Sequence, residues 1–136
     1  MLNLLSQLKI IDNTGAKSGI TIKRLKPKTS TKNSYATVGD ILSFSVRKTI
    51  NQNKIKRKKV YQALIVRTKK RGNMIKSNKS QKLGAHSIRY DDNAGVLIKI
   101  NNKEYIPLGS RIKGPICKSL KLQEGCLKIT SIAFAR

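Results

Sequence analysis

The stretch from Val60 to Arg71, VYQALIVRTKKR, constrains the fold more than any other part of the chain. It contains four consecutive apolar residues, Ala63–Val66, which are too few for a helix face and too continuous for a half-exposed strand. We therefore predict a strand that is covered on both sides. A rigid strand would fix the direction of the cations that follow it, which are Arg67, Lys69, Lys70 and Arg71. A strand that runs into a solvated basic loop is the alternative.

The charge of the chain indicates the class of its partner. Thirty Lys and Arg residues stand against six acids, so the formal net charge is +24. Self-repulsion of this size destabilises a compact domain unless a polyanion offsets it, which predicts a nucleic-acid partner. The apolar runs are far shorter than the roughly twenty residues of a membrane helix, so no span is expected. The length of 136 residues predicts a single domain over residues 1–136.

Soft metal ligands and catalytic groups are scarce. Cys117 and Cys126 have only His86 as a further soft ligand, so we expect no metal site, no cofactor and two free thiols. A nuclease would need paired carboxylates or a histidine dyad in one pocket. The six acids are scattered along the chain, and we therefore expect no catalytic residues.

Short strands separated by turns account for most of the chain. Asn and Gly mark several tight turns, in which Asp12 is expected to cap its own turn and Asp91–Asp92 to form a turn, not a metal site. The segments with strand-like patterns are Leu8–Ile11, Ile20–Leu25, Ile41–Lys48, Tyr61–Val66, Ile88–Tyr90 and Val96–Ile100.

Three basic segments interrupt these strands. Lys26–Ser34 reads as a loop that can touch a polyanion, and Lys54–Lys59 packs five cations into six residues at a hairpin tip. The polar segment 71–87 is long for a loop in a compact domain.

The pattern predicts a mostly β fold, namely a small β-barrel with a long basic β-hairpin and brief terminal helices. Closure of the sheet removes edges that would otherwise be exposed. After Ser110, short helices or a final strand are both possible. Gly125 separates two pieces of this segment, so Lys118 and Lys121 are predicted to contact a neighbouring protein or an opposing subunit. The alternative is that the apolar residues of both pieces cap one end of the barrel.

Five motifs occur in order between Leu8 and Ile132. They are Asp12–Ala16, Val38–Ile41, Ala63–Lys70, Ile88–Ala94 and Leu108–Pro115. Together they resemble the family of the universal large-subunit ribosomal protein number fourteen.

The resemblance implies a small five-stranded β-barrel with a projecting basic β-hairpin and short C-terminal helices. It implies further that this barrel binds large-subunit ribosomal RNA at the face that meets the small subunit, without catalysis. It also implies contacts with ribosomal proteins three and nineteen, with small-subunit RNA at an intersubunit bridge, and with a ribosome silencing factor. The Arg71–Ser87 loop departs from the family pattern because it is longer than the bacterial form.

Basic residues on the predicted loops, strand ends and hairpin form the candidate RNA-binding set. These are Lys17, Lys23, Arg24, Lys26, Lys28, Lys32, Arg47, Lys48, Lys54, Lys56, Arg57, Lys58, Lys59, Arg67, Lys69, Lys70, Arg71, Arg89 and Arg111. A free single-stranded nucleic-acid-binding barrel is the alternative, but such proteins stack bases on aromatic side chains, and only six aromatics are present.

Codon bias points to the location of the protein. Lys, Ile and Asn make up 49 of the 136 residues, which is expected when the coding DNA is rich in adenine and thymine. We therefore expect an organelle-encoded protein of the mitochondrial ribosome, with a bacterial cytoplasm or a plastid as alternatives.

Overall fold

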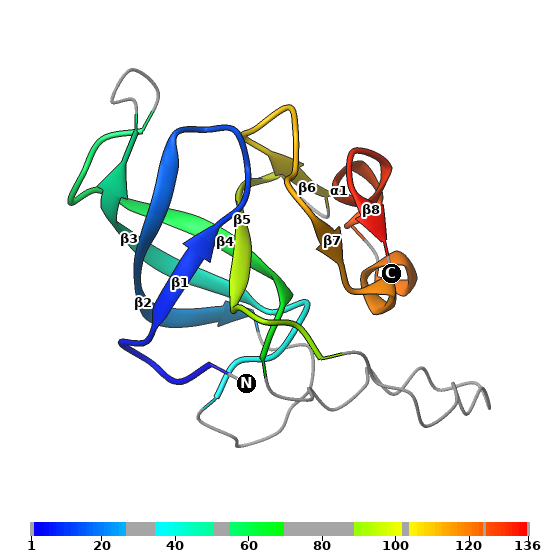
Figure 1. The fold of residues 1–136 in the computed structure, drawn as a ribbon, viewed down its shortest axis with the longest axis horizontal. Coiled ribbons are helices and arrows are strands. Elements are labelled where there is room, and N and C mark those ends of the chain that lie inside the picture. Colours follow the sequence, from blue (N-terminus) through cyan, green and yellow to red (C-terminus); the bar gives the residue numbers. More distant parts are fainter. Residues whose placement is uncertain are drawn as a thin grey trace.

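Six strands form one sheet, and five of them close into a ring (Figure 1). A computed structural model describes residues 2–26, 35–50, 55–69, 89–101, 104–123 and 125–135. Neighbouring strands are antiparallel and follow chain order, and β1 also pairs in parallel with β5. The strands are β1 (Gln7–Ile10), β2 (Ala16–Lys26), β3 (Ile41–Thr49), β4 (Val60–Arg67), β5 (Ala94–Asn101) and β6 (Glu104–Pro107). The predicted mostly β fold with five-stranded closure is confirmed.

The predicted strands lie where strands are observed except at Ile88–Tyr90, and the strand β6 was not predicted. β2 extends further at both ends than its alternating segment indicated. The prediction of a strand at Ile88–Tyr90 is wrong for Arg89 and Tyr90, which lie outside any strand, and Ile88 is outside the described residues. The pairing between β4 and β5 ends where Arg67 meets Ala94, so this ladder stops before it reaches Arg89 and Tyr90.

The interior of the ring is one of two apolar cores. Leu8, Leu42, Phe44 and Ile65 are buried there. A Cβ on Gly19 would lie 2.0 Å from the carbonyl oxygen of Ser45 and 2.6 Å from the Phe44 ring, so only glycine allows β2 to approach β3 this closely.

The second core lies between the outer face of the sheet and the C-terminal segment. This segment contains β7 (Pro115–Ile116), the 3-10 helix η1 (Lys118–Leu122), the helix α1 (Leu127–Ser131) and β8 (Phe134–Ala135). Its residues Ile116, Leu120 and Ile129 are buried in the same cluster as Leu64 and Val66 of β4.

β4 is therefore covered on both sides, as its apolar run predicted. Ala63, Leu64, Ile65 and Val66 all have no exposed surface. The C-terminal segment contains both of the alternatives left open by the sequence, because short helices and a short strand pairing of β7 with β8 occur together.

Asp12 caps its own turn, as predicted, and also accepts a hydrogen bond from the neighbouring strand β5. Its Oδ1 accepts hydrogen bonds from the amide and the hydroxyl of Thr14, and its Oδ2 accepts one from the amide of Leu97 at 2.8 Å. Burial raises the pKa of Asp12, and these hydrogen bonds oppose the rise. The side chain thus ties the β1–β2 turn to β5.

The remaining sequence predictions concern the two cysteines, a metal site and a membrane-spanning helix. Cys117 and Cys126 are free thiols, as expected. Among the described residues, no group of three or more His, Cys, Asp or Glu side chains could hold a metal ion. No helix in the same part of the chain is long and apolar enough to cross a bilayer.

Candidate nucleic-acid interface

Exposed cations lie close to the tip of the β3–β4 hairpin, where β3 ends and β4 begins. β2 begins, β3 ends and β4 begins at this end, because the three strands are antiparallel neighbours. In Figure 1 the hairpin and the C-terminal segment lie on opposite sides of the ring. We define the hairpin cluster as the exposed residues Lys17, Arg47, Lys48, Lys56, Arg57, Lys58 and Lys59.

Two irregularities in the pairing of β2 with β3 aim three of these cations. Lys17 is an extra residue on β2 between the pairs Ala16–Thr49 and Ser18–Lys48. Arg47 is an extra residue on β3 before the next pair. Bulges of this kind redirect side chains, and here the consecutive residues Arg47 and Lys48 are both exposed and do not alternate.

The turn that leads into β4 is held against β3. The amide of Lys58 donates to the carbonyl of Val46 at 2.9 Å, and the amide of Val46 donates to the carbonyl of Lys59 at 3.2 Å. Arg57 Nε also donates to the carbonyl of Arg47 at 3.1 Å. These hydrogen bonds fix the backbone of the turn, and with it the positions of the cations on the turn.

The hairpin cluster has no acidic partners among the described residues. The part of the chain that the structure describes contains four ion pairs, and none includes a member of this cluster. Seven cations close together without acids create a positive potential that attracts a polyanion.

Arg67 does not belong to this exposed set. The residue is 8% exposed, and its Nε donates to Asp92 Oδ1 at 2.6 Å while its Nη1 donates to the carbonyl of Pro115 at 2.9 Å. The prediction that Arg67 points outward as part of a charged tip is wrong. The β4–β5 pairing brings Asp92 beside the end of β4, and a buried guanidinium needs such a partner. The hydrogen bond from Arg67 in turn holds the pKa of Asp92 below its usual range.

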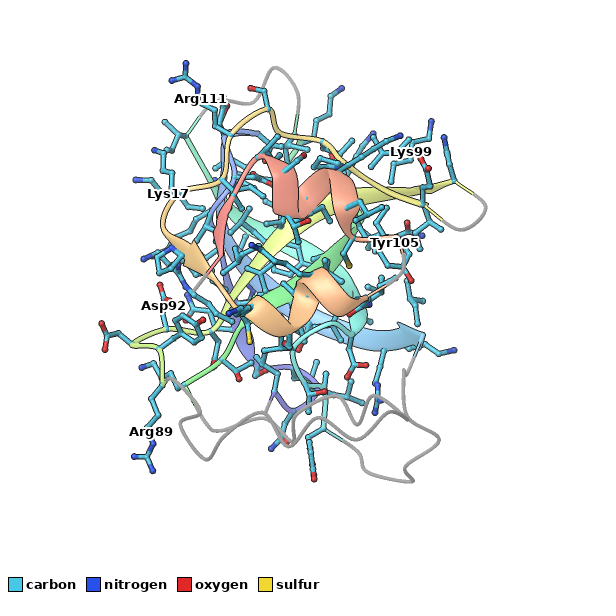
Figure 2. All side chains as sticks on the ribbon, turned by 90° about the vertical axis from the view of Figure 1, so that its right-hand side faces the viewer. Lys17, Arg89, Asp92, Lys99, Tyr105 and Arg111 are labelled. Carbon is cyan, nitrogen blue, oxygen red and sulfur yellow. The ribbon has the colours of Figure 1, made fainter. Side chains whose placement is uncertain are left out.

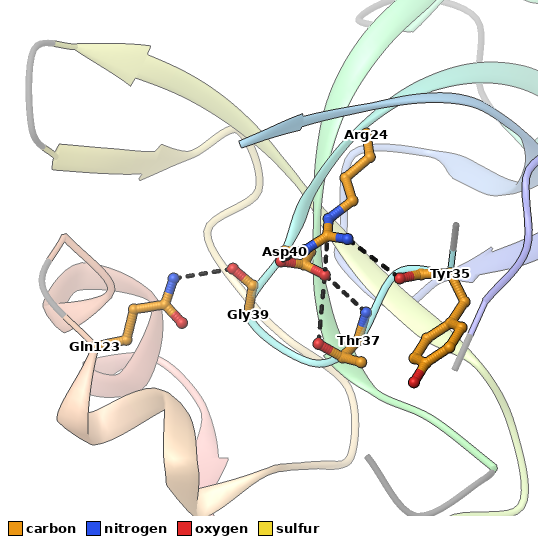
Figure 3. A network of polar contacts seen from close by, with 6 residues as sticks. All are labelled: Arg24, Tyr35, Thr37, Gly39, Asp40 and Gln123. Carbon is orange, nitrogen blue, oxygen red and sulfur yellow. Dashed lines mark hydrogen bonds and ion pairs between the residues drawn. The ribbon is translucent and has the colours of Figure 1, made fainter. Parts of the chain in front are cut away.

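Arg24 has a similar internal position at the same end of the sheet (Figure 3). Its Nε lies 3.2 Å from Asp40 Oδ2, and its Nη1 donates to the carbonyl of Tyr35 at 3.3 Å. Asp40 also accepts from the amide of Thr37 at 2.8 Å. The side chain of Arg24 is 14% exposed, so it braces the turn before β3 and is not displayed on the surface as the sequence had suggested.

Gln123 joins this network to the C-terminal segment. Its Nε2 donates to the carbonyl of Gly39 at 2.9 Å, and the residue is 2% exposed (Figure 3). The turn before β3 therefore contacts the C-terminal segment through a buried hydrogen bond.

The other predicted RNA-binding residues fall into two groups. Lys23, Lys69, Arg89 and Arg111 are exposed, and Figure 2 shows Lys17, Arg89 and Arg111 extending from one side of the domain. Lys26 lies in β2, but its side chain is not described. Lys28, Lys32, Lys54, Lys70 and Arg71 lie outside the described residues, as does the predicted loop 71–87.

The predicted protein contacts, Lys118 and Lys121, are exposed on η1. Four further exposed cations among the described residues were not selected from the sequence: Lys9, Lys99, Lys113 and Lys128. Alternation along the strands could have identified Lys9 and Lys99, because each neighbours buried residues. Lys9 pairs with Asp92 at 3.1 Å.

The family model described as ribosomal protein L14p/L23e matches residues 1–135 of the chain.

Proposed function

The chain belongs to the ribosomal protein L14p/L23e family, which makes it a protein of the large ribosomal subunit, and we propose that it binds large-subunit ribosomal RNA through the hairpin cluster. Members of this family are structural components of the ribosome. In this role the protein neutralises phosphates and holds an RNA junction in shape at the face that meets the small subunit.

One observation carries the proposal. Seven exposed cations stand on paired strands and a backbone-bonded turn, and no described acid is paired with them. Cations held in this way release counterions from a phosphate backbone when they bind it. The proposal therefore requires positions and charge, and it requires no reacting group.

The aromatic side chains favour this function over a free single-strand binder. Phe44 is fully buried, and Tyr35, Tyr61, Tyr90 and Tyr105 are each partly buried. The Tyr61 hydroxyl also accepts a hydrogen bond from the amide of Lys56 at 3.1 Å. The described aromatic side chains thus offer no exposed platform on which successive bases could stack.

Charge removal at the hairpin cluster tests the proposal. The variant carries Lys56→Gln, Arg57→Gln, Lys58→Gln and Lys59→Gln. Loss of four phosphate contacts should reduce the slope of log affinity against log salt by about 3 for large-subunit RNA. Fluorescence anisotropy over a salt series measures the slope, and circular dichroism checks the fold.

The matched control replaces four exposed cations outside the cluster by Gln, at Lys99, Lys113, Lys118 and Lys121. Its slope should stay close to that of the native protein. Equal slopes for the native protein and the hairpin variant would contradict the proposal.

Lys118 and Lys121 have a separate proposed role. Both are exposed on η1, which lies across the ring from the hairpin, so they are available to a neighbouring ribosomal protein or to the small subunit (Figure 1). Replacement of both by Glu should impair subunit joining more than binding to naked RNA. Sedimentation profiles test this, and normal joining would contradict it. Ribosomal proteins three and nineteen, a silencing factor and an intersubunit bridge are the predicted partners.

We also propose that the ribosome concerned is mitochondrial, on the basis of the Lys, Ile and Asn content. Co-sedimentation with the large subunit from purified mitochondria would support this location. Recovery only with plastid or bacterial ribosomes would overturn it.

A further inference from the structure

A hollow of about 270 Å³ lies beside the hairpin cluster, on β1, β2 and β3. Leu8 points into the ring, so its neighbour Gln7 points outward. The residues that line the hollow include Leu5, Gln7, Ser18, Ile20, Arg47 and Lys48.

Two cations reach this one hollow because of the bulge in β3. On a regular strand, consecutive residues point to opposite faces. The extra residue at Arg47 interrupts that alternation, and both Arg47 and Lys48 line the same space. Their charges make the hollow suited to an anion.

Leu5 forms an apolar wall of the hollow in an unfavourable conformation. The φ of Leu5 is 61°, which is a left-handed backbone conformation that is unfavourable for any residue with a Cβ atom. The residue is also 75% exposed. A hydrogen bond from its amide to the carbonyl of Thr21, at 2.9 Å, helps hold it there. Strained backbone tends to occur at sites of function, and strain on an exposed leucine is explained if that side chain contacts a ligand.

The lining combines three kinds of chemistry in a small space. Leu5 and Ile20 supply apolar surface, the Gln7 amide supplies a donor and an acceptor, and Arg47 and Lys48 supply positive charge. A phosphate alone would use only the cations. A nucleotide uses all three, because its base has apolar faces and a polar edge.

We propose that this hollow binds one nucleotide that is turned out of an RNA helix. The base lies against Leu5 and Ile20 with its edge toward Gln7, and the adjoining phosphate lies near Arg47 and Lys48. The inference rests on the proposed function, since the hairpin cluster must first bring RNA to this face. It adds recognition of an unstacked base to the binding of phosphates.

Two RNA probes test the inference: a fully paired duplex, and the same duplex with one bulged nucleotide. The native protein should bind the bulged probe about fivefold more tightly, which is the gain expected when roughly 40 Å² of apolar surface is removed from water. The substitution Leu5→Gly should remove this preference. It removes no charge, so the salt slope should be unchanged, and glycine adopts the left-handed backbone readily, so the domain should fold.

Leu4→Gly is the matched control, because Leu4 is 51% exposed and lies outside the hollow. It should keep the preference for the bulged probe. Equal binding of the two probes by the native protein, or an unchanged preference in Leu5→Gly, would overturn the inference while leaving the salt-dependent RNA binding intact. A flat salt response of the native protein would instead overturn the proposed function.

Discussion

The two ends of the β2–β3–β4 sheet use the same residue types for opposite purposes. At one end, Arg24 and Arg67 lie inside the protein and are paired with Asp40 and Asp92. At the other end, the seven cations of the hairpin cluster are exposed, and none of them is in an ion pair among the described residues.

The position of the acids makes this difference. β3 and β5 both begin at the paired end, and each is preceded by a turn that contains an aspartate, Asp40 or Asp92. An arginine that meets such a carboxylate can be buried, because the pair compensates much of the lost hydration. A cation that meets none stays in solvent, where it is available to an external anion. A cluster of basic residues is therefore informative about binding only once its acidic neighbours are known.

Removal of the partner of Arg67 should give the largest effect on stability. Asp92→Ala leaves the Arg67 side chain, which is 10% exposed, without its carboxylate partner, so we expect the free energy of unfolding to fall by about 3 kcal/mol. Urea unfolding measures the change. Asp91→Ala is the control, because Asp91 is exposed, and should change stability by no more than about 0.5 kcal/mol. Equal effects of the two substitutions would show that the Arg67–Asp92 pair is not structural.

Acid should reduce the difference in unfolding free energy between the native protein and the Asp92→Ala variant. The pKa of Asp92 lies below its ordinary value of 3.8, mainly because Arg67 donates a hydrogen bond to it. A lowered carboxyl pKa adds stability above the ordinary value, and this stability is lost as the pH falls through the folded-state pKa. The gap between native protein and Asp92→Ala should be full near neutral pH and should shrink below pH 3.8. Urea unfolding across this range measures the gap, and a constant gap would contradict the assignment.

A smaller loss is expected where the paired end contacts the C-terminal segment. Gln123→Ala removes the donor to the Gly39 carbonyl and leaves that carbonyl buried, which should cost about 2 kcal/mol of unfolding free energy. Thermal or urea unfolding measures the loss. Lys121→Ala, on the exposed surface of η1, should be close to neutral. If Gln123→Ala is also neutral, the hydrogen bond does not hold the segment in place.

The smallest effect has the opposite sign and lies at the hairpin end. Lys58 has a φ of 64°, so Lys58→Gly should relieve backbone strain and raise the free energy of unfolding by about 0.5 to 1 kcal/mol. The same change should lower the salt slope of RNA binding by roughly 0.7 to 0.9, as one phosphate contact is lost. Parallel unfolding and anisotropy experiments measure the two quantities. Lys56→Gly, which lacks a positive φ, should weaken binding without stabilising the fold.

Patterns within single segments predicted much of the fold. The apolar run Ala63–Val66 identified the doubly covered strand, and alternation from Ile41 to Lys48 identified β3. Asp12 was correctly expected in its turn, but its hydrogen bond to Leu97 joins residues far apart in the chain. Ile88–Tyr90 was assigned to a strand because its composition resembles one, although a strand also requires a partner beside it.

The sequence by itself determined where most strands and turns lie, the net charge and the density of cations, because these depend on residues that are close together in the chain. Only the tertiary structure decided which cations are exposed. Strand pairing brings Asp92 to Arg67 across 25 residues and Asp40 to Arg24 across 16. The bulges that direct Arg47 and Lys48 into one hollow likewise depend on how β2 meets β3. Local patterns do not encode such long-range partners, and the partner determines whether a charge stabilises the fold or remains free to bind.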